Sequence, residues 1–331
     1  MIETLLTAYL GLSTNYTEFS REDLRNLLDE LRGLSDRIKF PMYEYGTPTA
    51  TINLMPPHSN EYPEIIDWWD GNLPSMPEIL SIQARVLLPE QPFILESLSG
   101  EIRQAVQGSD ALAHHRLGAR RVFVKRIWDM VVIANIASVG VLDPIKSVII
   151  QDGEPVEDIG GYITTDALWD AWEVADEMGW PKLRVIEFAR AWEWAINQQG
   201  FLDGFGNAPV GRALNAFTQV LNPDSAFGPM QLFWALMGIE ALYTKGKYNV
   251  LRQVKKNCQV LLGSQESFDE KMTEMYEFRS RLIHGDLDFP GHPVMFDADK
   301  RLAEHDERLR ESTALTVAIL LAALQELIQR G

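Results

Sequence analysis

The chain of 331 residues contains a single cysteine, Cys258, and no long apolar run. One thiol excludes an internal disulfide framework and any zinc site built from several cysteine thiolates. The longest apolar runs, Val131–Leu142 and Ala314–Leu324, are roughly half of the ~20 residues that a transmembrane helix needs. The first ten residues lack the Lys or Arg of a secretory signal. We therefore expect a cytoplasmic protein without membrane contact, in a reducing environment.

Basic residues are scarce, with 30 Lys and Arg against 47 Asp and Glu and a net charge of −17. This charge argues against a large surface that coats nucleic acid, although it allows a local basic site. The acid is unevenly spread, since residues 187–331 carry 15 basic and 19 acidic side chains, a net −4, and residues 1–186 carry −13. A site for a polyanion is therefore expected in the second half of the chain.

The length predicts two domains rather than one. Leucines at three- and four-residue steps predict a helix over 18–38, whereas the many prolines in 40–92 predict loops and short strands, one of them at Thr49–Met55. Asp152-Gly153 between apolar runs indicates a β-hairpin. We therefore expect an α+β N-terminal domain over residues 1–180.

Helical periodicity dominates after residue 180, and glycine or proline lies in or near most of the gaps. The predicted helices there cover 183–199, 209–221, 228–244, 248–262, 266–284 and 306–330. Two earlier helices are predicted at 94–140 and 166–178. The predicted fold class is therefore mainly α, with a helical C-terminal domain over residues 181–331.

Several short motifs suggest a ligand but are better explained as structural. The stretch GFGNAPVG, 204–211, differs from a dinucleotide fingerprint because its third glycine comes two positions late and a helix precedes it. His114-His115 point about 100° apart on a helix and lack a nearby acid cluster. Trp68-Trp69 is typical of a core or interface, and FDADK, 296–300, lacks the rest of a calcium loop. We expect no metal site and no cofactor.

The stretch 241–263 stands out because it has five basic residues and no Asp or Glu. Such an excess of positive charge in an acidic chain has two explanations, a solvated helix face or a surface that binds phosphates. The basic residues are Lys245, Lys247, Arg252, Lys255 and Lys256.

The stretch EFRSRLIHGD, 277–286, combines two arginines with a histidine. On a helical wheel Arg279 falls within the apolar arc around Phe278 and Leu282. A guanidinium there must be paired or must face a cleft, because its desolvation alone is costly. His284 lies about 140° from Arg279 in an ideal helix, so the two side chains converge only near the helix end or across a partner subunit.

The surrounding sequence MYEFRSRLIHG, 275–285, is similar to the signature of HEPN domains, an arginine followed after four to six residues by a histidine. It most resembles the ApeA-like branch, in which a tyrosine precedes an Arg-Ser pair and His-Gly ends the motif. The stretches RALNAFTQVL (212–221), LMGIEALY (236–243) and VLLG (260–263) look like the family's other helices in order and spacing. The resemblance covers roughly 187–331, less than half of the chain.

The resemblance implies a helical bundle that forms a homodimer through the C-terminal domain. It places Arg279 and His284 at the catalytic positions, Ser280 and Tyr276 at their flanks, and Glu240 at a polar position facing the cleft. Many such domains are metal-independent ribonucleases in phage defence, toxin–antitoxin pairs or RNA processing, and some are non-catalytic binding modules. The predicted RNA-binding residues are Lys245, Lys247, Arg252, Lys255, Lys256 and Arg281.

The residue types fit RNA cleavage independently, since an imidazole exchanges protons near neutral pH and a guanidinium offers a planar fork to phosphate oxygens. The first hypothesis is a HEPN-type endoribonuclease with an N-terminal sensor domain for a phage trigger or a regulatory protein. The second is a non-catalytic HEPN module that dimerises and binds a partner or nucleotide. The third is a helical scaffold, which predicts Arg279 and His284 buried beside local carboxylates.

Overall fold

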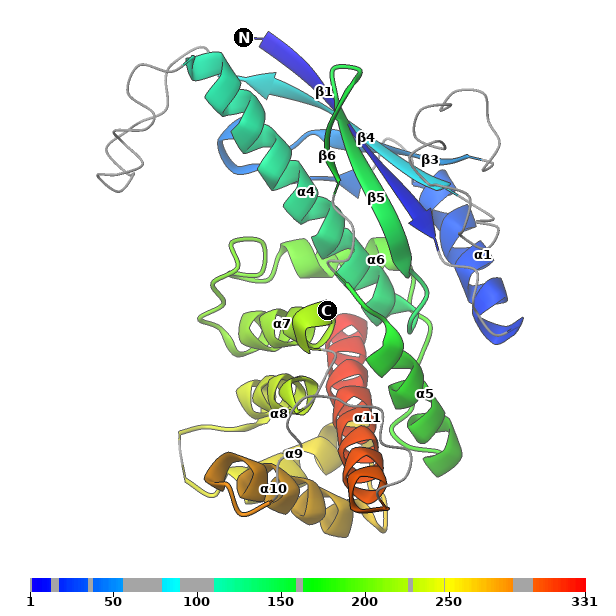
Figure 1. The fold of residues 1–331 in the computed structure, drawn as a ribbon, viewed down its shortest axis with the longest axis vertical. Coiled ribbons are helices and arrows are strands. Elements are labelled where there is room, and N and C mark those ends of the chain that lie inside the picture. The colour runs from blue at the N-terminus through cyan, green and yellow to red at the C-terminus, as the bar shows by residue number, and fades with distance from the viewer. Residues whose placement is uncertain are drawn as a thin grey trace. The chain divides into compact units, whose positions relative to one another are not determined.

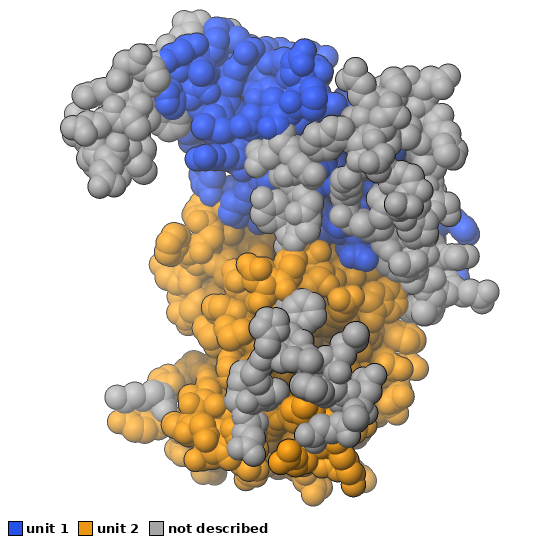
Figure 2. Space-filling view, viewed as in Figure 1, with its two compact units in different colours: residues 1–131, 141–162 blue, residues 132–140, 163–331 orange. Residues whose placement is uncertain are grey.

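The structure is a computed structural model that describes residues 2–12, 18–34, 38–55, 79–89, 110–158, 163–225, 229–246, 248–287 and 300–331. The described residues form nine α-helices and one six-stranded antiparallel sheet, which confirms a mainly α fold with an N-terminal α+β region (Figure 1). The chain forms two compact units (Figure 2). Unit 1 comprises residues 1–131 and 141–162, and unit 2 comprises residues 132–140 and 163–331. Unit 2 thus includes residues 163–180, which the sequence assigned to the N-terminal domain.

The sheet of unit 1 has the strand order β2-β3-β4-β1-β5-β6. Strand β1 lies inside the sheet, with Ala8 opposite Ile82 of β4 on one side and Ile149 of β5 on the other. Its residues from Leu6 to Leu12 are buried. The strands are β1 (Ile2–Leu12), β2 (Ile38–Lys39), β3 (Thr49–Met55), β4 (Ile79–Leu88), β5 (Pro144–Gln151) and β6 (Glu154–Asp158).

The predicted hairpin at Asp152-Gly153 is present and joins β5 to β6. Both residues have positive φ, 53° and 91°, the backbone that an Asp-Gly pair adopts in tight two-residue hairpin turns. The Asp152 carboxylate accepts hydrogen bonds from the Thr4 hydroxyl and the Leu5 amide and pairs with Arg116 at 2.9 Å. The hairpin is therefore tied to β1 and to the start of α4.

Two helices belong wholly or partly to unit 1, α1 (Glu18–Gly33) and α4 (Ala111–Ala137). The leucines of α1 predicted to be its apolar face are buried, and α1 contacts β3. Arg126 of α4 donates a hydrogen bond to the carbonyl of Pro41. Gln151 of β5 donates a hydrogen bond to the carbonyl of Arg116 in α4. These contacts hold α4 against the sheet, as Figure 1 shows. Residues 94–109 of the predicted helix lie outside the described residues.

Unit 2 contains all six helices predicted after residue 180, together with the predicted helix at 166–178. The connections are short, so sequence neighbours pack antiparallel, α7 on α8 and α9 on α10. The helices are α5 (Asp166–Met178), α6 (Phe188–Ile196), α7 (Pro209–Val220), α8 (Met230–Tyr243), α9 (Val250–Leu262), α10 (Phe268–His284) and α11 (Lys300–Arg330).

The core of unit 2 forms around α11, which packs against α5 to α9. Its residues from Ser312 to Leu324 are all buried. It is also the one helix among the described residues that is long and apolar enough to cross a membrane, and 83% of its most apolar window is buried inside the protein. The buried amide of Gln325 donates to the carbonyls of Ile136 and Arg184, so α11 also anchors the loop before α6.

The turn between α9 and α10 is fixed by Trp180. Its indole N–H donates to the carbonyls of Leu262 and Gly263, at 3.2 Å each, and its ring meets the Phe268 ring edge-on at 4.9 Å. This contact holds the last turn of α9 and the first turn of α10, the two helices that carry the predicted site.

Candidate functional site

Three predicted site residues meet between α8 and α10, and we call them the Arg279 cluster: Arg279, Glu240 and Tyr276. A guanidinium nitrogen of Arg279 lies 3.8 Å from Oε1 of Glu240, with the side chains 29% and 24% exposed. This distance is too long for a hydrogen bond. Nε of Arg279, Oε1 of Glu240 and the Tyr276 hydroxyl are buried without a hydrogen-bond partner among the described residues. Because buried polar groups are normally hydrogen-bonded, the cluster is only partly satisfied.

The Tyr276 hydroxyl is held in its neutral form. Burial raises the pKa of Tyr276, the nearby Glu240 carboxylate raises it further, and the positive charge of Arg279 only partly offsets both. The hydroxyl therefore keeps its proton at neutral pH and faces Glu240 without a hydrogen bond of normal geometry. The cluster thus carries one positive and one negative charge beside a neutral donor.

His284 is the last residue of α10 and is exposed. The helix ends there because Gly285 takes the left-handed conformation, with φ 73°, and the Asp286 N–H donates to the carbonyl of Arg281. Within the described part of the chain, no hydrogen bond or ion pair engages the His284 imidazole. The imidazole therefore projects into solvent at the end of the helix.

Arg279 and His284 lie on different faces of α10. They are five positions apart in the helix, which sets them about 140° apart around the axis and ~7.5 Å apart along it. Arg279 points toward α8, where Glu240 lies, and His284 points to solvent. A single chain does not bring both side chains to one phosphate. The scaffold hypothesis also fits poorly, because it predicts His284 buried beside a carboxylate.

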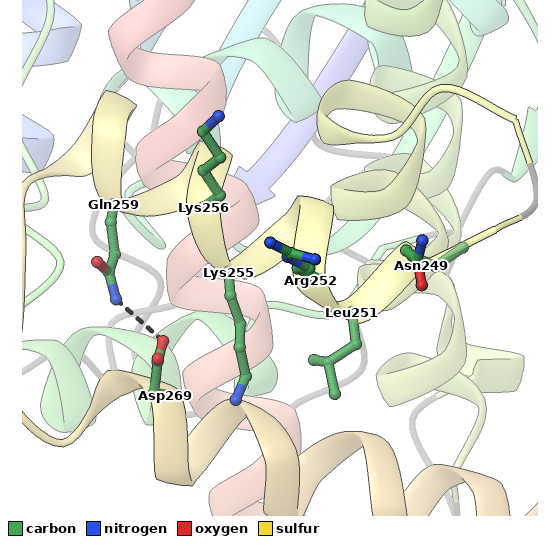
Figure 3. A pocket seen from close by; sticks show the side chains of 8 residues that line it. Asn249, Leu251, Arg252, Lys255, Lys256, Gln259 and Asp269 are labelled. Carbon is green, nitrogen blue, oxygen red and sulfur yellow. Dashed lines mark hydrogen bonds between the residues drawn. The ribbon is translucent and has the colours of Figure 1, made fainter.

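Three of the predicted RNA-binding residues gather in a surface hollow of about 690 Å³ beside α9, which we call the basic hollow (Figure 3). The Lys255 ammonium reaches α10 and donates to the Thr273 hydroxyl at 2.6 Å. The acidic residue in the lining, Asp269, accepts a hydrogen bond from Gln259. The lining residues are Asn249, Val250, Leu251, Arg252, Lys255, Lys256, Gln259 and Asp269.

Ideal helix geometry places His284 on the side of the α9–α10 pair that carries the basic hollow. The contacts Gln259–Asp269 and Lys255–Thr273 fix the antiparallel register of the two helices. His284 follows Thr273 by eleven residues, which places it about 20° away on the helical wheel and ~16 Å along the axis. The positive side chains of α9 therefore lead along α10 toward the exposed histidine.

Of the other predicted RNA-binding residues, those that the structure describes do not line this hollow. Lys245 is exposed in the segment before α9, and Lys247 lies outside the described residues. Arg281 lines a different hollow between α5, α10 and α11, where four glutamates also lie. Ser280 is exposed on α10. The glutamates are Glu177, Glu274, Glu277 and Glu311.

Glu240 also lines a groove that the sequence reasoning missed. The groove lies between α7 and α8, next to the glycine-rich stretch 204–211, which we interpreted only as a loop between helices. The repeated glycines were the available signal, since such spacing permits close backbone packing. Among the described residues no group of three His, Cys, Asp or Glu could hold a metal ion. Trp68-Trp69 and most of 296–300 lie outside those residues.

Comparison of the chain with protein-family models, curated proteins and solved structures finds no match.

Proposed function

We propose that the protein is a metal-independent endoribonuclease whose C-terminal half is a HEPN-type helical bundle. The observation that carries the proposal is the position of His284, exposed at the end of α10 on the side of the basic hollow. Arg279 lies in the same helix, partly exposed and only partly satisfied by Glu240. A histidine, an arginine and a nearby phosphate-binding surface are the groups that RNA cleavage without a metal requires.

The proposed reaction uses the 2′-hydroxyl of RNA as the nucleophile. An imidazole accepts its proton while the 2′-oxygen attacks the adjacent phosphorus, the bond to the 5′-oxygen breaks, and a second imidazole protonates that oxygen. The products are a 2′,3′-cyclic phosphate and a 5′-hydroxyl. The Arg279 guanidinium stabilises the charge that develops on the phosphorane oxygens. DNA lacks the 2′-hydroxyl and is not a substrate.

The active form in this proposal is a homodimer through the C-terminal half. Arg279 and His284 face different directions in one chain. A twofold axis can bring Arg279 of one protomer and His284 of its partner to the same phosphate. Light scattering at micromolar concentration is expected to give twice the chain mass, and a monomer contradicts this arrangement.

Unit 1 is the proposed regulatory part, which restrains the ribonuclease until a phage trigger or a regulatory protein engages it. Residues 1–131 and 141–162 carry 13 basic and 23 acidic side chains, a net charge of −10, and such a surface competes with RNA for the basic hollow. This assignment places the protein in the cytoplasm, in phage defence or toxin-like growth control. Production of the intact chain is then expected to slow growth only with the trigger, and His284→Ala is expected to remove that effect.

The second candidate function is a non-catalytic HEPN module that dimerises and binds RNA, a nucleotide or a protein. The ion pair between Arg279 and Glu240 favours it, because an arginine already paired is less available to a phosphate. This function predicts RNA binding by the intact protein without any cleavage.

Incubation of purified protein with total RNA and tRNA in EDTA tests the proposal. Wild type is expected to cut, and His284→Ala is expected to lose about 10²–10⁴-fold in rate. Its melting temperature is expected to be unchanged, since the imidazole is exposed. His114→Ala, which changes a histidine of α4 in unit 1, serves as the control. A His284→Ala protein that melts like wild type and still cuts RNA rules out the catalytic assignment, and binding without cutting by wild type supports the second candidate.

A further inference from the structure

The groove between α7 and α8 has the dimensions and chemistry of a small-molecule site. Its volume is about 730 Å³, within the usual range of ligand pockets. One face of each helix lines it, with Asn215 and Gln219 from α7 and Trp234 and Met237 from α8. We call it the α7–α8 groove, lined by Gly204, Phe205, Gly206, Asn207, Arg212, Asn215, Ala216, Gln219, Trp234, Met237, Glu240, Ala241, Thr244 and Gly246.

The loop at one end of the groove is held by backbone packing that only glycine allows. A Cβ on Gly200 would lie 2.2 Å from the carbonyl oxygen of Phe205, and one on Gly206 would lie 2.4 Å from the carbonyl carbon of Gly211. Arg212 adds a hydrogen bond of 2.8 Å to the carbonyl of Asn207. The loop backbone is therefore preformed, and Phe205, which it carries at the groove, is 88% exposed.

Glu240 connects the groove to the Arg279 cluster. Gly238 packs against Ala216, where a Cβ would be 3.4 Å from the alanine methyl. Since the helices are antiparallel, Glu240 lies level with the turn of α7 around Leu214. Phe205 and Glu240 both line the groove, and Glu240 joins it to Arg279.

The lining suits a planar base better than an isolated phosphate. Phe205 offers an exposed aromatic face, and stacking on such faces binds single-stranded nucleic acid without regard to sequence. The side-chain amides of Asn215 and Gln219 make no hydrogen bond to the described residues, so both can donate to and accept from a base edge. The two charged side chains of the lining, Arg212 and Glu240, have opposite signs, so the groove offers no net positive charge to a phosphate.

We propose that the α7–α8 groove is a base-binding subsite for single-stranded RNA, with Phe205 as its stacking platform. The inference rests on the proposed ribonuclease function. It adds that a base of the RNA substrate binds in the α7–α8 groove, next to the phosphate that Arg279 contacts. Glu240 has one face toward each site and acts as a positioning residue between them. Recognition by stacking and by carboxamides predicts unpaired RNA as the ligand and excludes a regular duplex.

Binding of fluorescein-labelled ten-nucleotide RNAs to the full-length His284→Ala protein tests the subsite, because this variant leaves the probe uncut. The probes are a decamer of adenylates and the same decamer with abasic sites. Phe205→Leu in this background is expected to weaken binding of the adenylate probe about 10-fold, the cost of a lost base–aromatic stack. Phe205→Trp is expected to retain the affinity. Val185→Ala, which changes an exposed apolar residue outside the groove, is the matched control.

The abasic probe distinguishes the subsite from general charge attraction. The abasic probe is expected to bind the His284→Ala protein equally well with and without the Phe205→Leu change. Equal losses for both probes, or no loss for either, overturn the base subsite, and RNA cleavage by the wild type in EDTA then leaves the ribonuclease proposal standing. Phe205-dependent binding of bases by a wild type that cuts no RNA overturns the ribonuclease and leaves the subsite in place.

Discussion

Each unit of the protein contains an arginine paired with a carboxylate, and the two pairs differ in how well they are satisfied. In unit 1 the side chain of Arg126 is 1% exposed and pairs with Asp129 at 2.7 Å. It also donates to the carbonyl of Pro41 and lies over the ring of Tyr43. In unit 2 the Arg279–Glu240 pair is 3.8 Å apart and leaves buried polar atoms on both residues unpartnered.

The difference separates a structural arginine from a candidate functional one. A buried charge is tolerated when its hydrogen-bonding groups are occupied, as Arg126 shows by bridging α4 to the segment around Pro41. Arg279 keeps hydrogen-bonding capacity unused and is partly exposed, so a phosphate can engage it without breaking a well-formed network. An ion pair with a carboxylate therefore does not by itself distinguish a structural arginine from a functional one. The hydrogen bonds made by the other guanidinium N–H groups must be known as well.

The largest expected effect on stability comes from breaking the Arg126–Asp129 pair. Arg126→Ala is expected to destabilise the protein by about 3–5 kcal/mol, because it leaves the Asp129 carboxylate buried with Lys125 as its one ion-pair partner among the described residues. Urea unfolding measures the change. Arg85→Ala is the matched control, since its ion pair with Glu3 is exposed and is worth about 0–1 kcal/mol. Equal losses in the two variants contradict the comparison.

At the Arg279–Glu240 pair we expect a large effect on RNA cleavage and a small effect on stability. Arg279→Ala is expected to reduce RNA cleavage by about 10²–10³-fold while leaving the melting temperature and the dimer nearly unchanged. Arg279→Lys is expected not to restore cleavage, because an ammonium lacks the planar fork. Cleavage rates and thermal melts of both variants provide the check. A strongly destabilised Arg279→Ala that still cuts RNA would show instead that this arginine is structural.

Much of unit 2 was predictable because its signals are local. Apolar residues at helical spacing, with glycines and prolines between them, gave all six helices after residue 180, and Asp152-Gly153 gave the hairpin. The central strand β1 was missed, because a strand buried on both faces shows no alternation of apolar and polar residues. The sequence of β1 was read only for a signal peptide.

The candidate site was predictable only in part, because its contacts join residues far apart in the chain. Helical spacing correctly placed Arg279 where it needs a partner, and the structure supplies Glu240 from α8. The basic stretch did not reveal that Arg252, Lys255 and Lys256 line one hollow while Arg281 lies among glutamates. The groove beside Glu240 depends on the packing of α7 against α8, which no local pattern encodes.

A smaller effect is expected at the basic hollow. Arg252→Ala is expected to weaken RNA binding for all sequences alike and to reduce the slope of log affinity against log salt by about 0.7, the value for one phosphate contact on a single strand. Fluorescence anisotropy between 50 and 200 mM salt, roughly the range over which such slopes are read, gives this number. Arg85→Ala, which changes an exposed arginine of β4 in unit 1, is the control. An unchanged slope with Arg252→Ala would assign these charges to a solvated helix face.

The smallest expected effect is that of Tyr276→Phe, which removes one partnerless hydroxyl from the Arg279 cluster. At neutral pH the free energy of unfolding is expected to change by less than about 1 kcal/mol, since no hydrogen bond of normal geometry is lost. Burial and Glu240 raise the pKa of Tyr276 above its unfolded value, so its contribution to stability is present below that value and is lost as the pH rises through the folded pKa.

Above pH about 10, where an unfolded tyrosine ionises, wild type is therefore expected to lose more stability than Tyr276→Phe. Denaturant titrations at neutral and alkaline pH measure the difference between the two proteins. Tyr248→Phe is the matched control, because that side chain is exposed, and it is expected to follow wild type at every pH. If Tyr276→Phe also follows wild type, the hydroxyl is hydrated rather than buried, and the contrast between Arg279 and Arg126 loses one of its three unsatisfied atoms.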